Sequence, residues 1–177
     1  MRKHRAFAFL LVVVALSLIW SAIRPHDYPT WFFELFLGFA GIAALVALYR
    51  RFPFSALVYI LAASHFAILA VGAKYTYAEM PLFNWLRDTF HLARNHYDRV
   101  GHFAQGFVPA IVAREVLLRT TDLKRGKMVG FLPICVCLAL SAFYELLEWW
   151  WAVLAYKEKG GDWLGWQGDM WDAQGGY

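Results

Sequence analysis

The stretch MVGFLPICVCLALSAFYELLEWWWAVLA, residues 128–155, is apolar throughout except for two acidic residues, Glu145 and Glu148. It is longer than the roughly 18 apolar residues that a helix needs to cross a hydrocarbon layer of about 30 Å. A carboxylate is costly at that depth, so a membrane helix with two of them one turn apart usually has a use for them. The stretch therefore predicts a membrane-spanning helix that contributes to a polar site.

Four more apolar stretches precede this one, and the composition agrees with a membrane protein. Apolar residues make up 60% of the 177-residue chain and aromatic residues 19%, and the mean hydropathy is +0.44, which is above ordinary soluble usage. We predict one all-α domain over residues 1–177, a polytopic helical membrane bundle. Its five spans are expected at about 6–23, 30–49, 54–73, 100–118 and 128–155, the first of them an uncleaved anchor.

The distribution of Lys and Arg predicts the orientation in the membrane. Segments 1–5, 50–53 and 119–127 hold nine basic residues in about 18 positions, whereas the segments on the other side hold seven in about 54. Basic residues are enriched on the cytoplasmic side. We therefore expect the N-terminus in the cytoplasm, and the segment 74–99 and the tail 156–177 on the outer side of a bacterial inner membrane.

The outer segment 74–99 is predicted to contain a helix that lies in the membrane interface over about 81–93. Pro81 suits the first turn of a helix, and Leu82, Leu86, Phe90 and Ala93 then fall near one face. The aromatic side chains of this segment fit the same level, where amphipathic rings settle between headgroups and lipid tails. They are Tyr75, Tyr77, Phe83 and Trp85.

Polar residues within the spans gather in the outer half of the predicted bundle. Asp98, His102 and Gln105 are spaced i, i+4, i+7 and share one stripe of a helix, and His96 comes just before it. We expect acid/base groups among Asp98, His102, Glu145 and Glu148. Candidate metal ligands are His96, Asp98, His102, Glu145, Glu148, Asp169 and Asp172, and the supporting residues are Gln105, His65 and Glu34.

This cluster fits two kinds of chemistry. Imidazole and carboxylate supply the N and O donors that a divalent metal such as zinc, manganese or iron takes, and they also transfer protons. Each residue has a simpler alternative. Asp98 could form an ion pair or cap the start of its helix; Glu145 and Glu148 could lie near the interface; His65 and Glu34 could hydrogen-bond between helices.

Several function classes lack a motif in this sequence. It contains no G-x-S-x-G, H-E-x-x-H or P-loop. Cys135 and Cys137, the two cysteines, point to different faces at i, i+2, so we expect buried, inert thiols. The basic residues are explained by topology, and we predict no nucleic-acid binding.

Four longer motifs resemble the YjdF-type bacterial inner-membrane proteins. These motifs are YTYAEMPL at 75–82, RNHYDRVGHFAQGF at 94–107, YELLEW at 144–149 and GDMWDAQ at 168–174. The resemblance implies a family of unknown function with several membrane helices. It also implies a further acidic residue and a last span after the final motif, where this chain ends at Tyr177.

A weaker similarity links the chain to the VanZ-like membrane proteins. It rests on the Asp-basic-x-x-His-Phe pattern at 98–103, on Glu145 and Glu148, and on the later Asp169 and Asp172. Some members of that family are linked to glycopeptide-antibiotic resistance, so the similarity implies a role in the cell envelope.

Three functions follow from these observations as hypotheses. The first is a metal-dependent or acid/base site that acts on a lipid or envelope intermediate at the outer leaflet. The second is a small cation or proton transporter. The third is a structural role in which the polar groups hold helices together. In each case the lipid bilayer is the surrounding partner.

Overall fold

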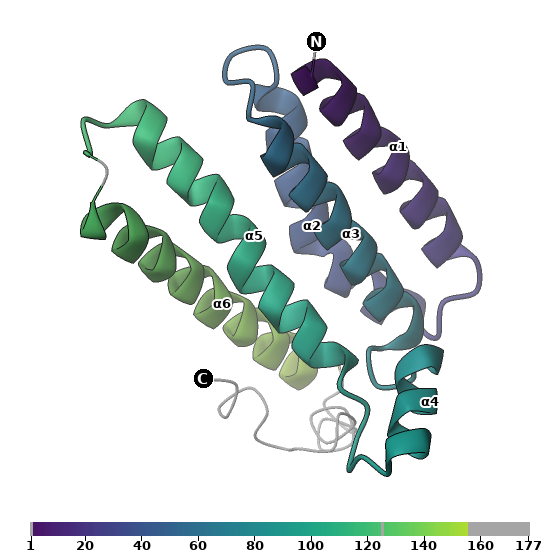
Figure 1. Ribbon diagram of the computed structural model, residues 1–177. Helices are drawn as coiled ribbons and strands as arrows, with labels where there is room; N and C mark the ends of the chain where they lie inside the picture. The colour runs from purple at the N-terminus through teal and green to yellow at the C-terminus, as the bar shows by residue number, and fades with distance from the viewer. Residues whose placement is uncertain (1, 125, 156–177) are drawn as a thin grey trace.

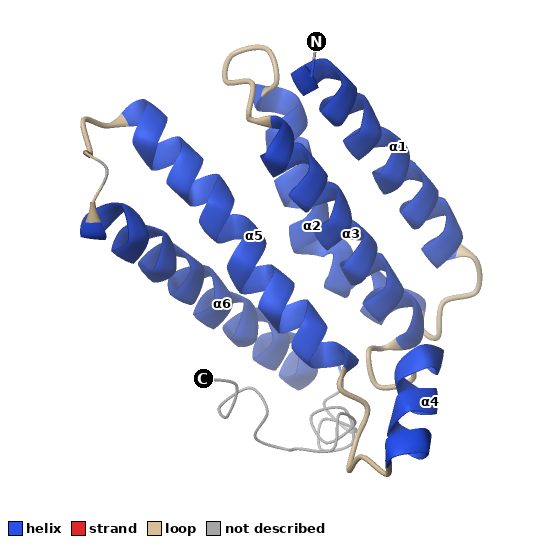
Figure 2. Cartoon of the chain, in the orientation of Figure 1, coloured by secondary structure: helices blue, strands red, loops and turns tan. Residues whose placement is uncertain are grey.

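The computed structural model describes residues 2–124 and 126–155, and these residues form helices joined by short loops (Figure 1). Figure 2 shows helix and loop, without strand, over this described part of the chain. The helices are α1 (Arg2–Ala22), α2 (Tyr28–Leu48), α3 (Ala56–Tyr75), α4 (Pro81–Phe90), α5 (Tyr97–Thr120) and α6 (Lys127–Ala155). The predicted all-α helical bundle is confirmed.

Capping residues explain where two of the long helices begin. The Asp27 carboxylate accepts hydrogen bonds from the backbone N–H and the hydroxyl of Thr30, at 2.9 and 2.6 Å, and starts α2. The Ser55 hydroxyl accepts from the backbone N–H of Val58 at 3.4 Å and starts α3. Each cap satisfies an N–H that has no partner within its own helix. The polar residues before each apolar stretch therefore set its first turn.

Four of the described helices are long and apolar enough to cross a membrane. They comprise Lys3–Ala22, Tyr28–Leu48, Ala56–Tyr75 and Lys127–Leu147. Helix α5 has 24 residues and a comparable length, but it carries five charged side chains and is less apolar. The membrane span predicted at 100–118 therefore corresponds to a helix, and its crossing of the bilayer stays a prediction.

The long helices run in alternating directions, which separates two ends of the bundle (Figure 1). The first residues of α1, the α2–α3 loop and the α5–α6 loop lie at one end, which we call the N-terminal end. The α1–α2 turn, α4 and the start of α5 lie at the other, the α4 end. Helix α3 packs against α1, α2 and α5, and α6 packs mainly against α5.

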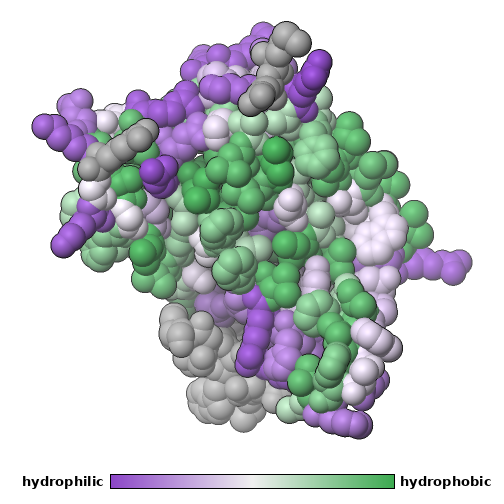
Figure 3. Space-filling model, viewed as in Figure 1, coloured by the Kyte–Doolittle hydropathy of each residue, from purple (hydrophilic) through white to green (hydrophobic). Residues whose placement is uncertain are grey.

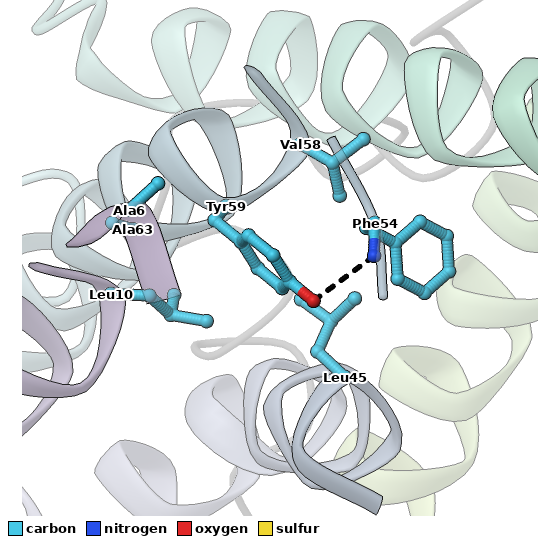
Figure 4. Close-up of a cluster of buried hydrophobic side chains, with 7 residues drawn as sticks. All are labelled: Ala6, Leu10, Leu45, Phe54, Val58, Tyr59 and Ala63. Carbon is cyan, nitrogen blue, oxygen red and sulfur yellow. Dashed lines mark hydrogen bonds between the residues drawn. The ribbon is translucent and has the colours of Figure 1, made fainter. Parts of the chain in front are cut away.

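The core of the bundle lies between α1, α2 and α3. Figure 4 shows one cluster of buried side chains there, in which the backbone N–H of Phe54 donates to the Tyr59 hydroxyl at 3.0 Å. Small residues such as Ala6 and Ala63 are buried in this cluster and allow close approach of the helices, as is usual in membrane bundles. A second cluster joins Leu35 of α2 to Phe66 of α3.

Many large apolar side chains point outward instead. Leu16 and Ile19 of α1 and Leu138 of α6 are each about 60% exposed. Figure 3 shows hydrophobic side chains over much of the middle of the molecule and hydrophilic ones concentrated toward its ends. A surface this apolar is expected to face lipid rather than water.

The interfacial segment differs from the prediction in two respects. Helix α4 ends at Phe90, because His91 adopts a left-handed conformation with φ 52°, so Ala93 lies outside it. Tyr77 does not lie at the lipid surface. Its ring is 8% exposed and packs between Gly72 of α3 and Gly101 of α5. Trp85, by contrast, is 58% exposed and agrees with the interface interpretation.

The two thiols also differ from each other. Cys137 is buried, as predicted, but Cys135 is exposed on α6. The prediction that both are buried was therefore wrong for Cys135. Helical spacing of i, i+2 puts the two side chains on different faces, and only one of those faces meets protein.

Candidate functional site

A rigid joint connects α4 to α5 at the α4 end. The Asn95 side chain donates to the Met80 carbonyl at 3.1 Å and to Asn84 Oδ1 at 2.8 Å, and its own Oδ1 accepts from the Tyr97 backbone N–H at 2.9 Å. Asn95 is only 9% exposed. Because one amide ties the start of α4 to the start of α5, the position of α5 is fixed relative to α4.

Asp98 pairs with Arg94 at this joint. Its Oδ2 lies 3.2 Å from Arg94 Nη2, and the Asp98 side chain is 10% exposed. The N-cap of α5 is His96, without a side-chain cap bond. Of the alternatives considered for Asp98, the ion pair is therefore confirmed and capping is wrong, because α5 begins at Tyr97, two residues earlier than capping by Asp98 requires.

Two buried polar atoms at the start of α5 lack a hydrogen-bond partner. They are Asp98 Oδ1 and His96 Nδ1. Buried polar atoms are normally paired, and an exception at a joint this well ordered calls for an explanation. Both atoms have almost no exposed surface, so protein surrounds them closely.

His102 meets Glu145 one turn further along α5. His102 Nδ1 lies 4.0 Å from Glu145 Oε1, which joins α5 to α6. The side chain of Glu145 is 15% exposed and that of His102 is 44% exposed. The pair is thus partly shielded by protein and open on the imidazole side, and its 4.0 Å separation is that of an ion pair rather than of a hydrogen bond.

A second polar contact, formed by Glu34, lies at the same depth in the bundle as the His102–Glu145 pair. Its Oε2 accepts a hydrogen bond from the Tyr144 hydroxyl at 3.2 Å, and Glu34 is 7% exposed. Tyr144 and Glu145 are neighbours on α6, so this helix contacts an acidic residue of α2 and a histidine of α5 within one turn. Three helices therefore contribute to one polar level.

We expect Tyr144→Phe to lower the free energy of unfolding by about 1 kcal/mol, because it deletes the hydroxyl that donates to the buried Glu34 carboxyl. Unfolding by sodium dodecyl sulfate in mixed micelles measures the change. Tyr28→Phe is a matched control, because the Tyr28 hydroxyl is exposed and its bond to the Ala22 carbonyl is long, at 3.4 Å. Equal stabilities of the two variants would contradict the assigned contact.

The remaining predicted residues do not join a common cluster in the described part of the chain. His65 lies on α3 with its Nε2 buried and unpaired, and Gln105 is half-buried on α5. The side chain of Glu148 and all of Asp169 and Asp172 lie outside the described residues. Among residues 2–124 and 126–155, no three His, Cys, Asp or Glu side chains are grouped closely enough to hold a metal ion.

Sequence reasoning missed three residues of this region, namely Arg94, Asn95 and Tyr144. Tyr144 carried a usable signal, since a hydroxyl inside an apolar span needs a partner. Asn95 also carried one, because an asparagine just before a helix commonly bonds to the backbone two residues on. Arg94 precedes Asp98 by four residues, a spacing that suits an ion pair.

A bundle of long apolar helices that buries ionisable groups near one end defines an integral membrane protein. The chain belongs to the DUF2238 family, described as predicted membrane proteins, which it matches over residues 6–175. It is 46% identical over 163 residues to the inner membrane protein YjdF of Escherichia coli strain K12, an alignment that covers 92% of this chain and 78% of that protein.

No solved structure matches the chain significantly. The resemblance to the YjdF-type family is confirmed by these comparisons. The weaker similarity to VanZ-like proteins stays a prediction.

Proposed function

We propose that the chain is a multi-pass protein of the bacterial inner membrane with an acid/base site, centred on His102 and Glu145, that acts on a lipid or envelope intermediate. In this proposal the N-terminus lies in the cytoplasm and the α4 end faces outward. The observation that carries it is the approach of His102 Nδ1 to Glu145 Oε1 between α5 and α6.

The depth of the pair fits a substrate at the outer leaflet. His102 lies five residues after the first residue of α5, which is about 7.5 Å along the helix axis. That distance places the imidazole just below the level of α4, whose exposed Trp85 and Leu82 suit the membrane interface. A headgroup linkage of a lipid is the part of a membrane molecule that reaches this level.

The chemistry requires one proton to move between the substrate and the pair. The His102 imidazole would exchange that proton, and Glu145 would orient the ring and balance its charge when it is protonated. The Glu34 to Tyr144 hydrogen bond supports the site by fixing the turn of α6 that carries Glu145. Glu145 is thus a positioning residue, and His102 is the group that would contact substrate.

Genetic complementation tests the proposal. In a strain that lacks the gene, mass spectrometry of the envelope lipids should reveal a changed component, and the unaltered protein should restore the profile. His102→Ala and Glu145→Gln should fail to restore it at equal protein abundance. The matched control Asp88→Asn changes an exposed carboxylate on α4, which pairs with the neighbouring Arg87, and should restore the profile fully.

Full restoration by His102→Ala would refute the acid/base site. If the variants restore the lipid profile less well only to the extent that their protein abundance is lower, the structural role would be favoured instead. Elemental analysis of the purified protein tests the metal alternative. Stoichiometric metal that disappears in both His102→Ala and Glu145→Gln would replace our proposal with a metal site, for which Asp169 and Asp172 would be the additional candidate ligands.

A further inference from the structure

Four basic side chains gather at the N-terminal end of the bundle. Lys3 and Arg5 belong to the first turn of α1, and Arg50 and Arg51 lie in the α2–α3 loop, shortly after α2 ends at Leu48. All four basic side chains are exposed. Figure 1 shows the start of α1 beside this loop. We call these four residues the basic patch.

Contacts between α1 and the end of α2 hold the patch together. His4 is hydrogen-bonded through Nδ1 to the hydroxyl of Tyr49, and the ring of Phe7 stacks on the Tyr49 ring with centroids 3.7 Å apart. His4 sits between the two basic residues of α1, and Tyr49 directly precedes those of the loop. The pair of basic residues on α1 therefore lies next to the pair in the loop.

Carboxylates in the described part of the chain do not balance the charge of the patch. The described acidic residues at the N-terminal end are Glu115 and Asp122. Glu115 is already bound, because its Oε1 accepts from Arg119 Nη1 at 2.8 Å and from the Ser55 backbone N–H at 2.9 Å. Asp122 belongs to the α5–α6 loop, which Figure 1 shows well apart from α1. The patch therefore offers its positive charges to an external anion.

The depth of the patch selects the phosphates of lipid headgroups as that anion. The apolar spans of α1 and α2 cover Lys3–Ala22 and Tyr28–Leu48. The patch thus lies where both spans end and the hydrocarbon layer gives way to headgroups. Clusters of about four or more Lys and Arg beside a membrane helix commonly bind anionic lipids, and guanidinium groups bind phosphate through two parallel N–H bonds.

We propose that the basic patch binds an anionic phospholipid with two phosphate groups, as in cardiolipin. One phosphate lies at Lys3 and Arg5 of α1, and the other lies at the two arginines of the loop. A lipid with a single phosphate would satisfy only one of the two pairs. The patch is at the opposite end of the bundle from His102, so this inference does not rest on the proposed function.

Native mass spectrometry of the purified full chain, with lipids of the same acyl-chain type, tests the inference. The apparent affinity should fall from cardiolipin, with two phosphates, to phosphatidylglycerol, with one, and again to zwitterionic phosphatidylethanolamine. Cardiolipin should bind at least about tenfold more tightly than phosphatidylethanolamine. Equal binding of the three lipids by the unaltered protein would overturn the inference, as would phosphatidylglycerol that binds as tightly as cardiolipin.

Double replacements locate the site without changing the apolar surface that meets the acyl chains. Each should weaken cardiolipin binding about tenfold. They are Lys3→Gln with Arg5→Gln and Arg50→Gln with Arg51→Gln. The matched control is Lys124→Gln with Lys127→Gln, which removes two exposed charges at the same end of the bundle but beside α6. It should leave cardiolipin binding nearly unchanged. An equal loss in the control would overturn the inference, because it would show attraction to general positive charge.

Tyr49→Phe tests the pairing of the two elements while it keeps every charge. It removes the hydroxyl that is hydrogen-bonded to His4, so the two basic pairs are no longer held side by side. The advantage of cardiolipin over phosphatidylglycerol should shrink, and phosphatidylglycerol itself should bind as before. This variant also decides the question if a double replacement folds poorly. An undiminished advantage of cardiolipin in Tyr49→Phe would overturn the assignment of one phosphate to each pair.

Discussion

Gly72→Ala should lower the free energy of unfolding by about 3 kcal/mol, because the added methyl group has no space. A Cβ at Gly72 would lie 2.2 to 2.5 Å from three atoms of the Tyr77 ring. That ring cannot move aside easily, since its other side lies against Gly101, where a Cβ would come within 2.9 Å of it. The backbone of Tyr77 is also held, because its N–H donates to the Gly72 carbonyl at 3.0 Å.

Gly41→Ala provides a matched control for this prediction. Gly41 also lies inside a membrane helix, but a Cβ there meets nothing within 4 Å. Its replacement should leave the stability unchanged or raise it slightly, because alanine favours helix over glycine. Unfolding by sodium dodecyl sulfate in mixed micelles measures both variants. Equal effects at the two positions would show that Tyr77 does not wedge α3 against α5.

Arg119→Ala should lower the free energy of unfolding by about 2 kcal/mol, because it removes contacts at the N-terminal end of the bundle. Arg119 Nη1 donates to the Pro53 carbonyl and to Glu115 Oε1, each at 2.8 Å, and its guanidinium carbon lies 3.7 Å from the centre of the Phe52 ring. The α2–α3 loop is thereby fastened to α5. We keep the expected cost modest because the Arg119 side chain is 35% exposed and water screens its charge.

Three variants separate the contacts of this arginine. Arg114→Ala removes a charge from an exposed position of the same helix and should have little effect. Arg119→Lys keeps the charge but not the forked set of guanidinium donors. Its loss of stability should therefore lie between the losses in Arg114→Ala and Arg119→Ala. Glu115→Gln weakens the acceptor that also binds the Ser55 backbone N–H at 2.9 Å. A loss in Arg119→Ala no larger than in Arg114→Ala would refute the assigned role.

The helices were predictable because each depends on a local pattern. The apolar stretch at 128–155 predicted α6, which begins at Lys127, and the Pro81 signal predicted the first residue of α4. The last residue of α4 was harder to predict from the sequence. It depends on His91 taking a left-handed conformation, which histidine does only occasionally, so the apolar face suggested a helix that continued to Ala93.

The positions of the candidate residues along their helices were predictable, but their partners on neighbouring helices were not. The spacing placed Asp98 and His102 on one stripe of α5. In the structure, however, Asp98 pairs with Arg94 of its own segment, and His102 pairs with Glu145 of α6. Spacing within one helix cannot tell which helix packs beside it. The same limit applies to Tyr77, because its aromatic character suits both a lipid interface and the wedge between two glycines that the structure shows.

The order in which the helices pack has a consequence for synthesis at the ribosome. Helix α3 packs against both α1 and α2, so these three can assemble as they enter the bilayer, whereas α6 follows last and packs mainly on α5. Until α6 arrives, Glu34 has not yet met the Tyr144 hydroxyl. An unfinished chain therefore leaves this carboxyl without its hydroxyl donor, and the last helix to be made completes a polar contact that the earlier helices cannot form by themselves.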